Sequence, residues 1–473
     1  YEPDEMYGYS KTFDIHANGF DDSNSRFSLY WNHDRFNLNT FYYENNPYKN
    51  SSAEIGFFHQ ATLGVRPKYL MEINETDSIE VIGSFLWTDH MSPRLGPGGV
   101  TGVVVVDKGG SERHWEAKTV YRTTRFNRHS FAMGLSYGEK DFFQDEQFFS
   151  GDLDSGYRFH TFATMDTKWG EESLFAEDVI ALNERWTASL GLRYDKINLT
   201  EMSSNLWGEG ETKSPDSIEG HPSPRIATGY ELDKNTDLKA SYQHGFRTPD
   251  VAYYLWNLFY KDGAESLGLD FPTLDIESMD SFELNLQKNF PERKLNAQLN
   301  LYHNIYKDQL SWEFYDAIGL YTQEEIDAIR TAVGLPLGPP TGSTLNDPET
   351  IRSSGGEVIV TFLPFTSTQI NLSYGYVQLE DAAVMQYPEH QIKVNTLSSF
   401  WNDRINFSLN YLYNSSYSES NLPQAHSIYR EDRHLVDAAV TYNVNPDMSL
   451  RLSVNNLFES DVPPMVFTPE RLN

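Results

Sequence analysis

The stretch INFSLNYLY, residues 405–413, alternates apolar and polar side chains through almost its whole length. Successive side chains of a β-strand point to opposite faces of the sheet, so a strand here has one apolar and one polar face. The same alternation recurs along the chain, for example in residues 131–137, 295–301, 370–376 and 450–454. The sequence therefore predicts a chain built from amphipathic β-strands.

About nineteen segments show this alternation, and many of them run for 11 to 14 residues. Strands of soluble proteins average about 5–6 residues, whereas a tilted strand of roughly 9–11 residues crosses a bilayer. Short links rich in turn residues separate these segments, and they alternate with long links. Outer-membrane barrels have short turns on one side and long loops on the other. We expect the main long loops, all at one end, to be residues 90–112, 139–171, 197–221, 248–277 and 310–351.

Two details of this assignment concern segments inside the long loops. We place Arg158–Thr167 within the loop 139–171, because the alternation of short and long links is then preserved. Thr322 and Glu325 form the start of a capping box, and Ile326 and Ile329 follow at helical spacing. These residues predict a short helix in the loop 310–351, acting either as a lid or partner surface or as a stabiliser of the loop.

Composition restricts the class of protein further. The chain has 37 Lys and Arg against 68 Asp and Glu, a net charge of −31, which argues against a nucleic-acid partner. Mean hydropathy is −0.55, and no apolar run approaches the roughly 20 residues of a membrane helix. Since every backbone polar group in hydrocarbon must be paired, strands can cross a bilayer only in a closed sheet. The pattern predicts an all-β, antiparallel transmembrane β-barrel in a bacterial outer membrane.

Several strings resemble the barrel of TonB-dependent outer-membrane receptors, and they occur in the order of that family. The most specific are GFRTPD at residues 245–250 and VNNLF at residues 454–458, and weaker ones include GLRYD at residues 191–195. The resemblance covers residues 172–458 well, whereas residues 1–170 fit by their alternation alone. It implies a barrel of 22 strands and an N-terminal plug domain that contacts the energy-coupling TonB–ExbB–ExbD system.

The sequence departs from this family pattern at both ends. No plug domain is present in residues 1–473, and nineteen strands leave three to be found. We therefore interpret residues 1–473 as one outer-membrane barrel that is incomplete at both ends, with a plug expected upstream of residue 1. The resemblance implies TonB-energised uptake of a scarce, large nutrient such as a ferric siderophore, cobalamin, haem or an oligosaccharide. A passive porin and a plug-less structural or partner-binding barrel are the alternatives, and the expected partners include outer-membrane lipid and lipopolysaccharide.

Candidate ligand-binding residues come from one aromatic loop. The loop 248–277 contains five rings suited to stacking on a ligand, or to packing within the loop itself: Tyr253, Tyr254, Trp256, Phe259 and Tyr260.

Three arginines on neighbouring predicted strands form a second candidate site. Arg193, Arg225 and Arg247 could contact a plug or an anionic ligand, or they could pair in the lumen with acids such as Asp195 and Glu231. The sequence has no Cys, no spacing typical of metal ligands and no catalytic motif. We therefore expect neither an enzyme nor a cofactor or metal site.

Overall fold

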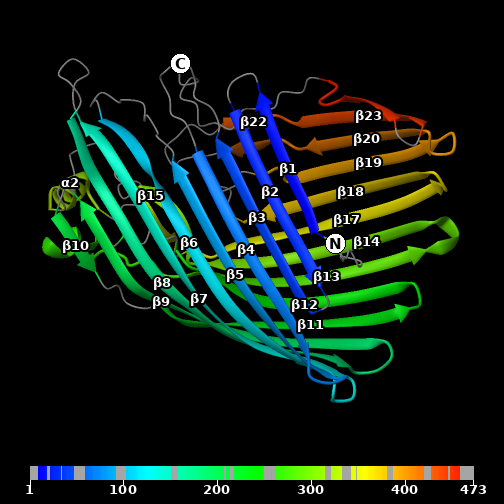
Figure 1. Cartoon of the computed structure of the whole chain (residues 1–473), viewed down its shortest axis with the longest axis horizontal. Helices are drawn as coiled ribbons and strands as arrows, with labels where there is room; N and C mark the ends of the chain where they lie inside the picture. Colours follow the sequence, from blue (N-terminus) through cyan, green and yellow to red (C-terminus); the bar gives the residue numbers. More distant parts are fainter. Residues whose placement is uncertain are drawn as a thin grey trace. The chain divides into compact units, whose positions relative to one another are not determined.

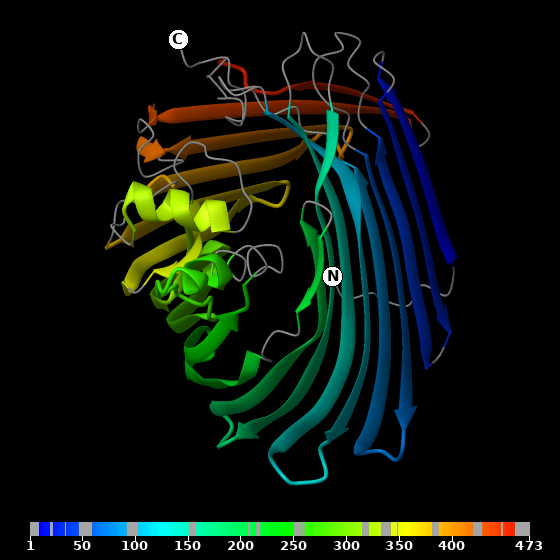
Figure 2. The same cartoon turned by 90° about the vertical axis from the view of Figure 1, so that its left-hand side faces the viewer.

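Long antiparallel strands make up most of the computed structural model of the chain (Figures 1 and 2). It divides into two units, which are described separately: unit 1 comprises residues 1–179 and 191–223, and unit 2 comprises residues 180–190 and 224–473. The structure describes residues 9–18, 22–33, 35–46, 59–91, 103–150, 158–206, 209–213, 218–249, 257, 261–314, 321–332, 342–347, 349–380, 387–419, 428–445 and 448–458.

Unit 1 is a succession of strands in which β1 to β6 each pair antiparallel with the next strand in the chain, up to β7. Figure 1 shows β2 to β6 running side by side. Short β10 pairs with the end of β9. The strands that lie wholly or partly in this unit are β1 (Tyr9–Asn18), β2 (Asp22–His33), β3 (Phe36–Asn46), β4 (His59–Glu72), β5 (Asp77–Met91), β6 (Val103–Thr123), β7 (His129–Ser150), β8 (Arg158–Ala181), β9 (Trp186–Leu206), β10 (Glu209–Lys213) and β11 (Ile218–Asp233).

Unit 2 continues the same pattern from β11 to β24. Its remaining elements are β12 (Thr236–Arg247), β13 (Glu277–Phe290), η1 (Pro291–Arg293), β14 (Leu295–Lys307), β15 (Gln309–Phe314), α2 (Gln323–Ala332), β16 (Gly342–Asp347), β17 (Ile351–Phe365), β18 (Thr368–Leu379), β19 (His390–Phe400), β20 (Ile405–Asn414), β21 (Tyr417–Glu419), β22 (Ile428–Arg430), β23 (Arg433–Asn445) and β24 (Met448–Val454). The pairs β15–β16 and β21–β22 form separate two-stranded sheets.

The predicted number of strands is confirmed. Within the described residues the main sheet has twenty strands, which are the nineteen expected strands and the short β10. Because consecutive strands are antiparallel, the short turns of each unit lie at one end of its strands and the long connections lie at the other end. None of the helices among these residues is long and apolar enough to cross a membrane.

Strand registers give each unit one apolar and one polar face. Phe407 lies opposite Val440 and Leu409 opposite Ala438, whereas Asn406 lies opposite Thr441. On the same apolar face, the register aligns residues predicted to contact lipid, namely Leu299, Leu301, Ile370, Leu372, Leu450 and Leu452. The predicted grouping of side chains on two faces is confirmed, and the contact with lipid stays a prediction.

The placement of Arg158–Thr167 in a loop is wrong. These residues begin β8, which continues without a break to Ala181. The loops 90–112, 139–171 and 197–221 are likewise shorter than predicted, since β6 starts at Val103, β7 ends at Ser150 and β9 ends at Leu206. Strand pairing uses backbone groups alone, so it extends past the segment where lipid contact imposes an alternation of side chains. Periodicity cannot reveal such extensions.

Candidate functional site

Two long connections of unit 2 fold together. One joins β12 to β13 (residues 248–276), and the other joins β14 to β17 (residues 308–350) and contains β15, α2 and β16. Their described residues form what we call the loop assembly, in which α2 lies next to the segment 261–276 (Figure 2). Both connections fall within the long loops 248–277 and 310–351, which the sequence predicts at one end of the barrel.

Asn346 is the polar residue that joins the two connections. Its Nδ2 donates hydrogen bonds to the backbone carbonyl oxygens of Asp275 (3.0 Å) and Asp308 (2.8 Å). Its Oδ1 accepts a hydrogen bond from the backbone N–H of Asp275 at 2.7 Å. One side chain therefore satisfies three backbone groups on segments up to 71 residues away.

A small apolar core lies inside the loop assembly. The rings of Phe271 and Tyr321 stack with their centroids 5.9 Å apart and their planes 11° from parallel. The Tyr321 hydroxyl donates a hydrogen bond to the backbone carbonyl oxygen of Asp270. Ile326 and Ile329 of α2 are each only 1% exposed, and the other buried apolar residues are Ala264, Leu274 and Leu345. Burial raises the pKa of Tyr321 to about 12, with a smaller contribution from the nearby carboxylates.

The predicted capping box and helix are confirmed. The backbone N–H and the hydroxyl of Thr322 both donate to Oε2 of Glu325, at 2.8 and 2.9 Å. The Glu325 N–H in turn donates to the Thr322 hydroxyl at 3.3 Å. These bonds satisfy donors that a helix start leaves open, and they lower the pKa of Glu325. Since α2 buries its two isoleucines, the helix stabilises the loop, which was one of the two predicted roles.

Asn257 links two distant parts of the first connection, residues 248–276, by side-chain hydrogen bonds to the backbone. It is fully buried, and its Nδ2 donates to the carbonyl oxygen of Pro272 at 2.9 Å. Its Oδ1 accepts the N–H of Leu274 at 3.2 Å. Sequence reasoning missed both Asn257 and Asn346, because their partners are backbone groups distant in sequence and no motif marks them.

The predicted Arg247 lies at the base of the loop assembly. Its guanidinium pairs with the carboxylate of Glu277 across β12 and β13 at 2.8 Å. The same Glu277 oxygen accepts the N–H of Leu310 at 3.0 Å. Arg247 therefore connects the sheet to the start of β15 through one shared carboxylate.

The other two predicted arginines differ from each other. Arg193, in unit 1, makes an ion pair with Asp195 at 2.7 Å and donates to the Ser173 hydroxyl at 3.0 Å, so the predicted pairing with Asp195 is confirmed. Arg225, in unit 2, lies opposite Gln243, and its guanidinium makes no hydrogen bond or ion pair among the described residues. Pairing with a lumenal acid, one of the two roles considered for the three arginines, is therefore not formed by Arg225 within this part of the chain.

The five aromatic residues of the predicted ligand site lie outside the described residues: Tyr253, Tyr254, Trp256, Phe259 and Tyr260. The connections around them are strongly acidic. Residues 248–276 contain five Asp or Glu and residues 308–350 contain eight, against one Lys and one Arg. Within the part of the chain that the structure describes, no group of three or more His, Cys, Asp or Glu could hold a metal ion.

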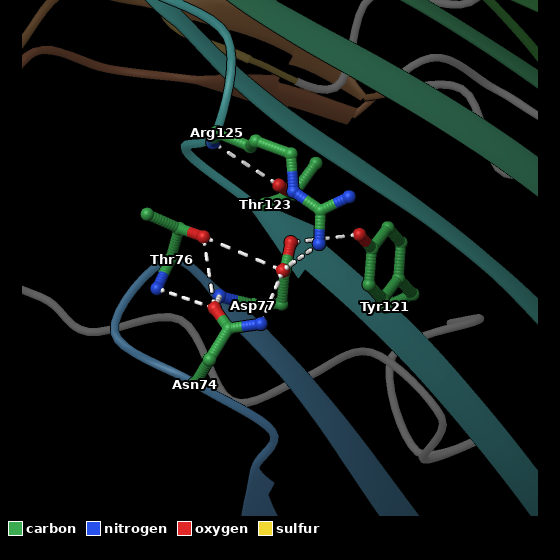
Figure 3. A network of polar contacts seen from close by, with 6 residues as sticks. All are labelled: Asn74, Thr76, Asp77, Tyr121, Thr123 and Arg125. Carbon is green, nitrogen blue, oxygen red and sulfur yellow. Dashed lines mark hydrogen bonds and ion pairs between the residues drawn. The ribbon is translucent and has the colours of Figure 1, made fainter.

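A dense polar network lies at a turn of unit 1 (Figure 3). Asp77 is only 2% exposed and accepts hydrogen bonds from the Asn74 amide (2.7 Å) and the Tyr121 hydroxyl (2.8 Å). The Arg125 guanidinium pairs with the same carboxylate, and the Arg125 N–H donates to Thr123 at 3.1 Å. The network joins the turn before β5 to the residues after β6, and thus fixes the register of these strands rather than presenting a ligand site.

Comparison with known proteins identifies the fold and the family. The family model described as "TonB dependent receptor-like, beta-barrel" matches residues 3–457. No curated protein sequence matches the chain. The solved structures that it resembles include transporters and uptake receptors at 10–14% sequence identity, a level that shows the fold alone.

Three of these structures illustrate the likeness. The ferric citrate transporter FecA has 14% identity and a TM-score of 0.67, over 95% of this chain and 68% of that chain. The ferric-catecholate import receptor Fiu from E. coli K12 has 13% identity and a TM-score of 0.64, over 95% and 72%. The ferric yersiniabactin uptake receptor FyuA from Yersinia pestis has 10% identity and a TM-score of 0.65, over 95% and 69%. The chain therefore belongs to the TonB-dependent receptor-like β-barrel family, whose members are β-barrels of the bacterial outer membrane.

Proposed function

We propose that this chain is the barrel of a receptor that takes up a scarce, large nutrient with energy supplied through TonB. The nutrient would be a ferric siderophore, cobalamin, haem or an oligosaccharide. Energy coupling would run from the TonB–ExbB–ExbD system through a plug domain, and the barrel would sit among outer-membrane lipid and lipopolysaccharide.

The observation that carries this proposal is the construction of the loop assembly. Two connections with a shared apolar core, a capped helix and the three bonds of Asn346 form an ordered surface. A receptor for a dilute ligand gains affinity when its binding surface is ordered before the ligand arrives. A passive porin requires no such surface, because its solutes diffuse through without being held.

Charge restricts the ligand that this surface would accept. The excess of carboxylates in residues 248–276 and 308–350 creates a negative potential, which repels free anions and favours neutral or cationic ligands, including metal complexes. Three of the similar solved structures are titled as transporters or receptors of ferric citrate, ferric catecholates and ferric yersiniabactin. Ferric chelates without a net negative charge are therefore the first class to test.

The test is uptake of labelled nutrients by cells that express or lack the protein, in strains with and without functional TonB. The panel would contain ferric siderophores, cobalamin, haem and oligosaccharides. The proposal expects one ligand to enter only when both the receptor and TonB are present. Uptake that needs the protein but not TonB would instead identify a passive porin. Envelope defects without any loss of uptake would identify a structural barrel.

The aromatic residues of the first connection give this proposal a second test. We expect simultaneous replacement of Tyr253, Tyr254 and Trp256 by Ala to weaken binding of the imported ligand by more than tenfold, about 1.4 kcal/mol. Barrel assembly, followed by heat-modifiable migration in gels, should be unaffected. Unchanged affinity in this triple variant would remove the aromatic cluster from the binding site.

A further inference from the structure

The apolar face of unit 2 ends in histidines at the long-loop end of its strands. On four strands, β12, β14, β19 and β23, a His is the next residue of that face beyond the run of apolar and aromatic side chains. The register places these residues on the same face as Leu299 and Leu301. We call them the histidine belt: His244, His303, His390 and His434.

One arrangement of side chains occurs twice in the histidine belt. Nδ1 of His390 lies 2.9 Å from the hydroxyl oxygen of Tyr374, and its ring centroid lies 5.2 Å from that of Tyr376, both on β18. His434 repeats this arrangement with two tyrosines of β20, at 2.9 and 5.0 Å: Tyr411 and Tyr413. Strands β19, β20 and β23 lie side by side (Figure 1), so the two copies are neighbours on one surface.

The partner of Nδ1 fixes the position of the proton on these rings. His303 Nδ1 lies 2.8 Å from the Ser354 hydroxyl, just as His390 Nδ1 lies beside a tyrosine hydroxyl. When the hydroxyl donates to Nδ1, the ring proton is on Nε2, which becomes a donor. Neither Nε2 has a hydrogen-bond partner among the residues that the structure describes. His303 and His390 therefore offer two N–H donors to a group outside the sheet.

Cationic side chains accompany the histidine belt on the same face. The carboxylate of Asp280 is shared by His244, with Nδ1 at 2.8 Å, and by Lys307, with Nζ at 3.3 Å. Arg352 pairs with Glu380 at 3.0 Å. Lys307 and Arg352 each keep about half of the side chain exposed, so both can contact a second anion. Because Asp and Glu outnumber Lys and Arg in the chain, composition alone does not explain these basic groups.

The histidine belt lies where the predicted membrane-spanning part of the strands ends. On β20 the apolar face extends from Ile405 to Tyr413, and a tilted strand crosses a bilayer in roughly 9–11 residues. Tyr413 lies directly opposite His434. Tyrosines are enriched at the membrane–water interface, which explains the phenol rings at this level. It does not explain histidines such as His390, whose Nδ1 is engaged within the sheet and whose Nε2 is left to the surroundings.

The apolar face of β7, in unit 1, ends without a histidine at its long-loop end. Trp115 and Tyr137 contact each other with ring centroids 5.4 Å apart, as expected at a membrane interface. The next residue of this face, Glu139, pairs with Lys168 at 2.7 Å, and Asp141 lies 3.9 Å from the same ammonium group. A strand can therefore leave the apolar face with charged side chains that pair among themselves, so the histidine belt is not a general requirement of strand ends.

We propose that the histidine belt binds the phosphorylated headgroups of lipopolysaccharide in the outer leaflet. Phosphate oxygens accept hydrogen bonds from Nε2–H groups, and bonds to a charged acceptor are stronger than those between neutral groups. Lys307 and Arg352 supply positive charge beside these donors, and the apolar face next to them contacts the acyl chains of the same lipid. The inference goes beyond the proposed function, because it concerns the membrane face and applies equally to a receptor, a porin or a structural barrel.

The test is native mass spectrometry of the purified protein in detergent, titrated with three lipids. They are lipid A with two phosphates, which is the lipid part of lipopolysaccharide, the same lipid A without phosphates, and phosphatidylglycerol. Bisphosphorylated lipid A should bind roughly tenfold more tightly than either of the others. The double variant His303→Phe/His390→Phe keeps an aromatic ring at both positions. It should lose roughly tenfold in affinity for bisphosphorylated lipid A and bind the dephosphorylated lipid as before.

His129→Phe is the matched control. His129 also lies on an apolar face and has its Nδ1 engaged, 2.7 Å from Asp178, but it lies at the turn end of β7. This variant should bind bisphosphorylated lipid A like the unmodified protein. A second pair, His303→Asn/His390→Asn, keeps a polar atom near the position of Nδ1 and removes Nε2, so it should bind as weakly as the Phe pair.

Four results would overturn the inference. They are equal binding of lipid A with and without phosphates, equal binding of phosphatidylglycerol, unchanged affinity in the Phe pair, and an equal loss of affinity in His129→Phe. Heat-modifiable migration verifies the folding of each variant. Since the titration requires neither TonB nor a nutrient, its outcome is separate from that of the uptake experiment.

Discussion

Asn346 binds the backbone of Asp275 in both directions, donating to its carbonyl oxygen at 3.0 Å and accepting from its N–H at 2.7 Å. This side chain thus bonds to the backbone as a paired strand residue does, and its partner Asp275 is 71 residues away in sequence. The third bond goes to Asp308 at the start of the second connection. Asn346 therefore links the end of the first connection to the start of the second.

Replacing Asn346 by Ala should loosen the loop assembly without unfolding the barrel. Three hydrogen bonds are lost, and we expect a local destabilisation of about 1–3 kcal/mol. Hydrogen exchange followed by mass spectrometry should show faster exchange in residues 261–276 and 342–347, with unchanged rates in β18 to β20. Glu349→Ala, an exposed change in the same connection, is the control. Equal exchange in the two variants would contradict the role given to Asn346.

Acid should weaken the start of α2. Because donors from Thr322 lower the pKa of Glu325 below its ordinary value of 4.5, the ionised form stabilises the helix. That stability is present above the ordinary pKa of Glu and is lost as the pH falls through the lowered pKa. Hydrogen exchange of residues 323–332, corrected for intrinsic rates, should therefore accelerate below about pH 4.5. Glu325→Gln should flatten this dependence, and an unchanged acid response in that variant would exclude the capping box as its source.

Tyr321 should titrate well above the ordinary pKa of a tyrosine. Burial raises its pKa to about 12, so the neutral phenol stabilises the fold below the ordinary value of 10.0 and this stability is lost as the pH rises toward 12. The difference in phenolate absorbance between the unmodified protein and Tyr321→Phe should isolate this titration. The same variant keeps the stack on Phe271 and loses one hydrogen bond, at a cost of about 1 kcal/mol. A difference midpoint near 10 would contradict the burial of the hydroxyl.

The arginines of the polar faces should differ in their contribution to stability. Arg193→Ala leaves the carboxylate of Asp195, which is 14% exposed, without its cation, whereas Arg225→Ala breaks no bond among the described residues. Since Arg193 is itself about half exposed, we expect a loss of only about 1–2 kcal/mol for Arg193→Ala and almost none for Arg225→Ala. Urea unfolding in detergent or lipid measures both. Equal destabilisation would show that the ion pair has no special role.

Adjacent residues of β20 should respond oppositely to charge. Leu409 lies on the apolar face and Asn410 on the polar face, so Leu409→Arg should cost about 2–4 kcal/mol if it lies near the bilayer midplane, and Asn410→Arg much less. Unfolding from lipid vesicles gives the two free energies. Labelling with a water-soluble thiol reagent gives an independent measure, and modification of Leu409→Cys but not Asn410→Cys would reverse the assignment of the faces.

The sequence by itself determined the strands and their faces. In the segment around Phe407 and Asn406, residues on one face are apolar and residues on the other are polar, so the alternation can be read directly from the residue types. The capping box of Thr322 and Glu325 was predictable for a similar reason, because its bonds span only three residues. The pairing of Arg193 with Asp195 is equally local.

Only the tertiary structure decided the contacts that join distant segments. Asn346 and Asn257 bind backbone groups, which every residue possesses, so no residue type in the sequence marks their partners. The extension of β8 back to Arg158 depends on backbone pairing where alternation no longer applies. The alignment of Asn371, Asn395 and Asn410 on three neighbouring strands likewise depends on the strand register, since each asparagine is ordinary within its own strand. Local periodicity fixes which way a side chain faces, and strand pairing fixes what lies next to it.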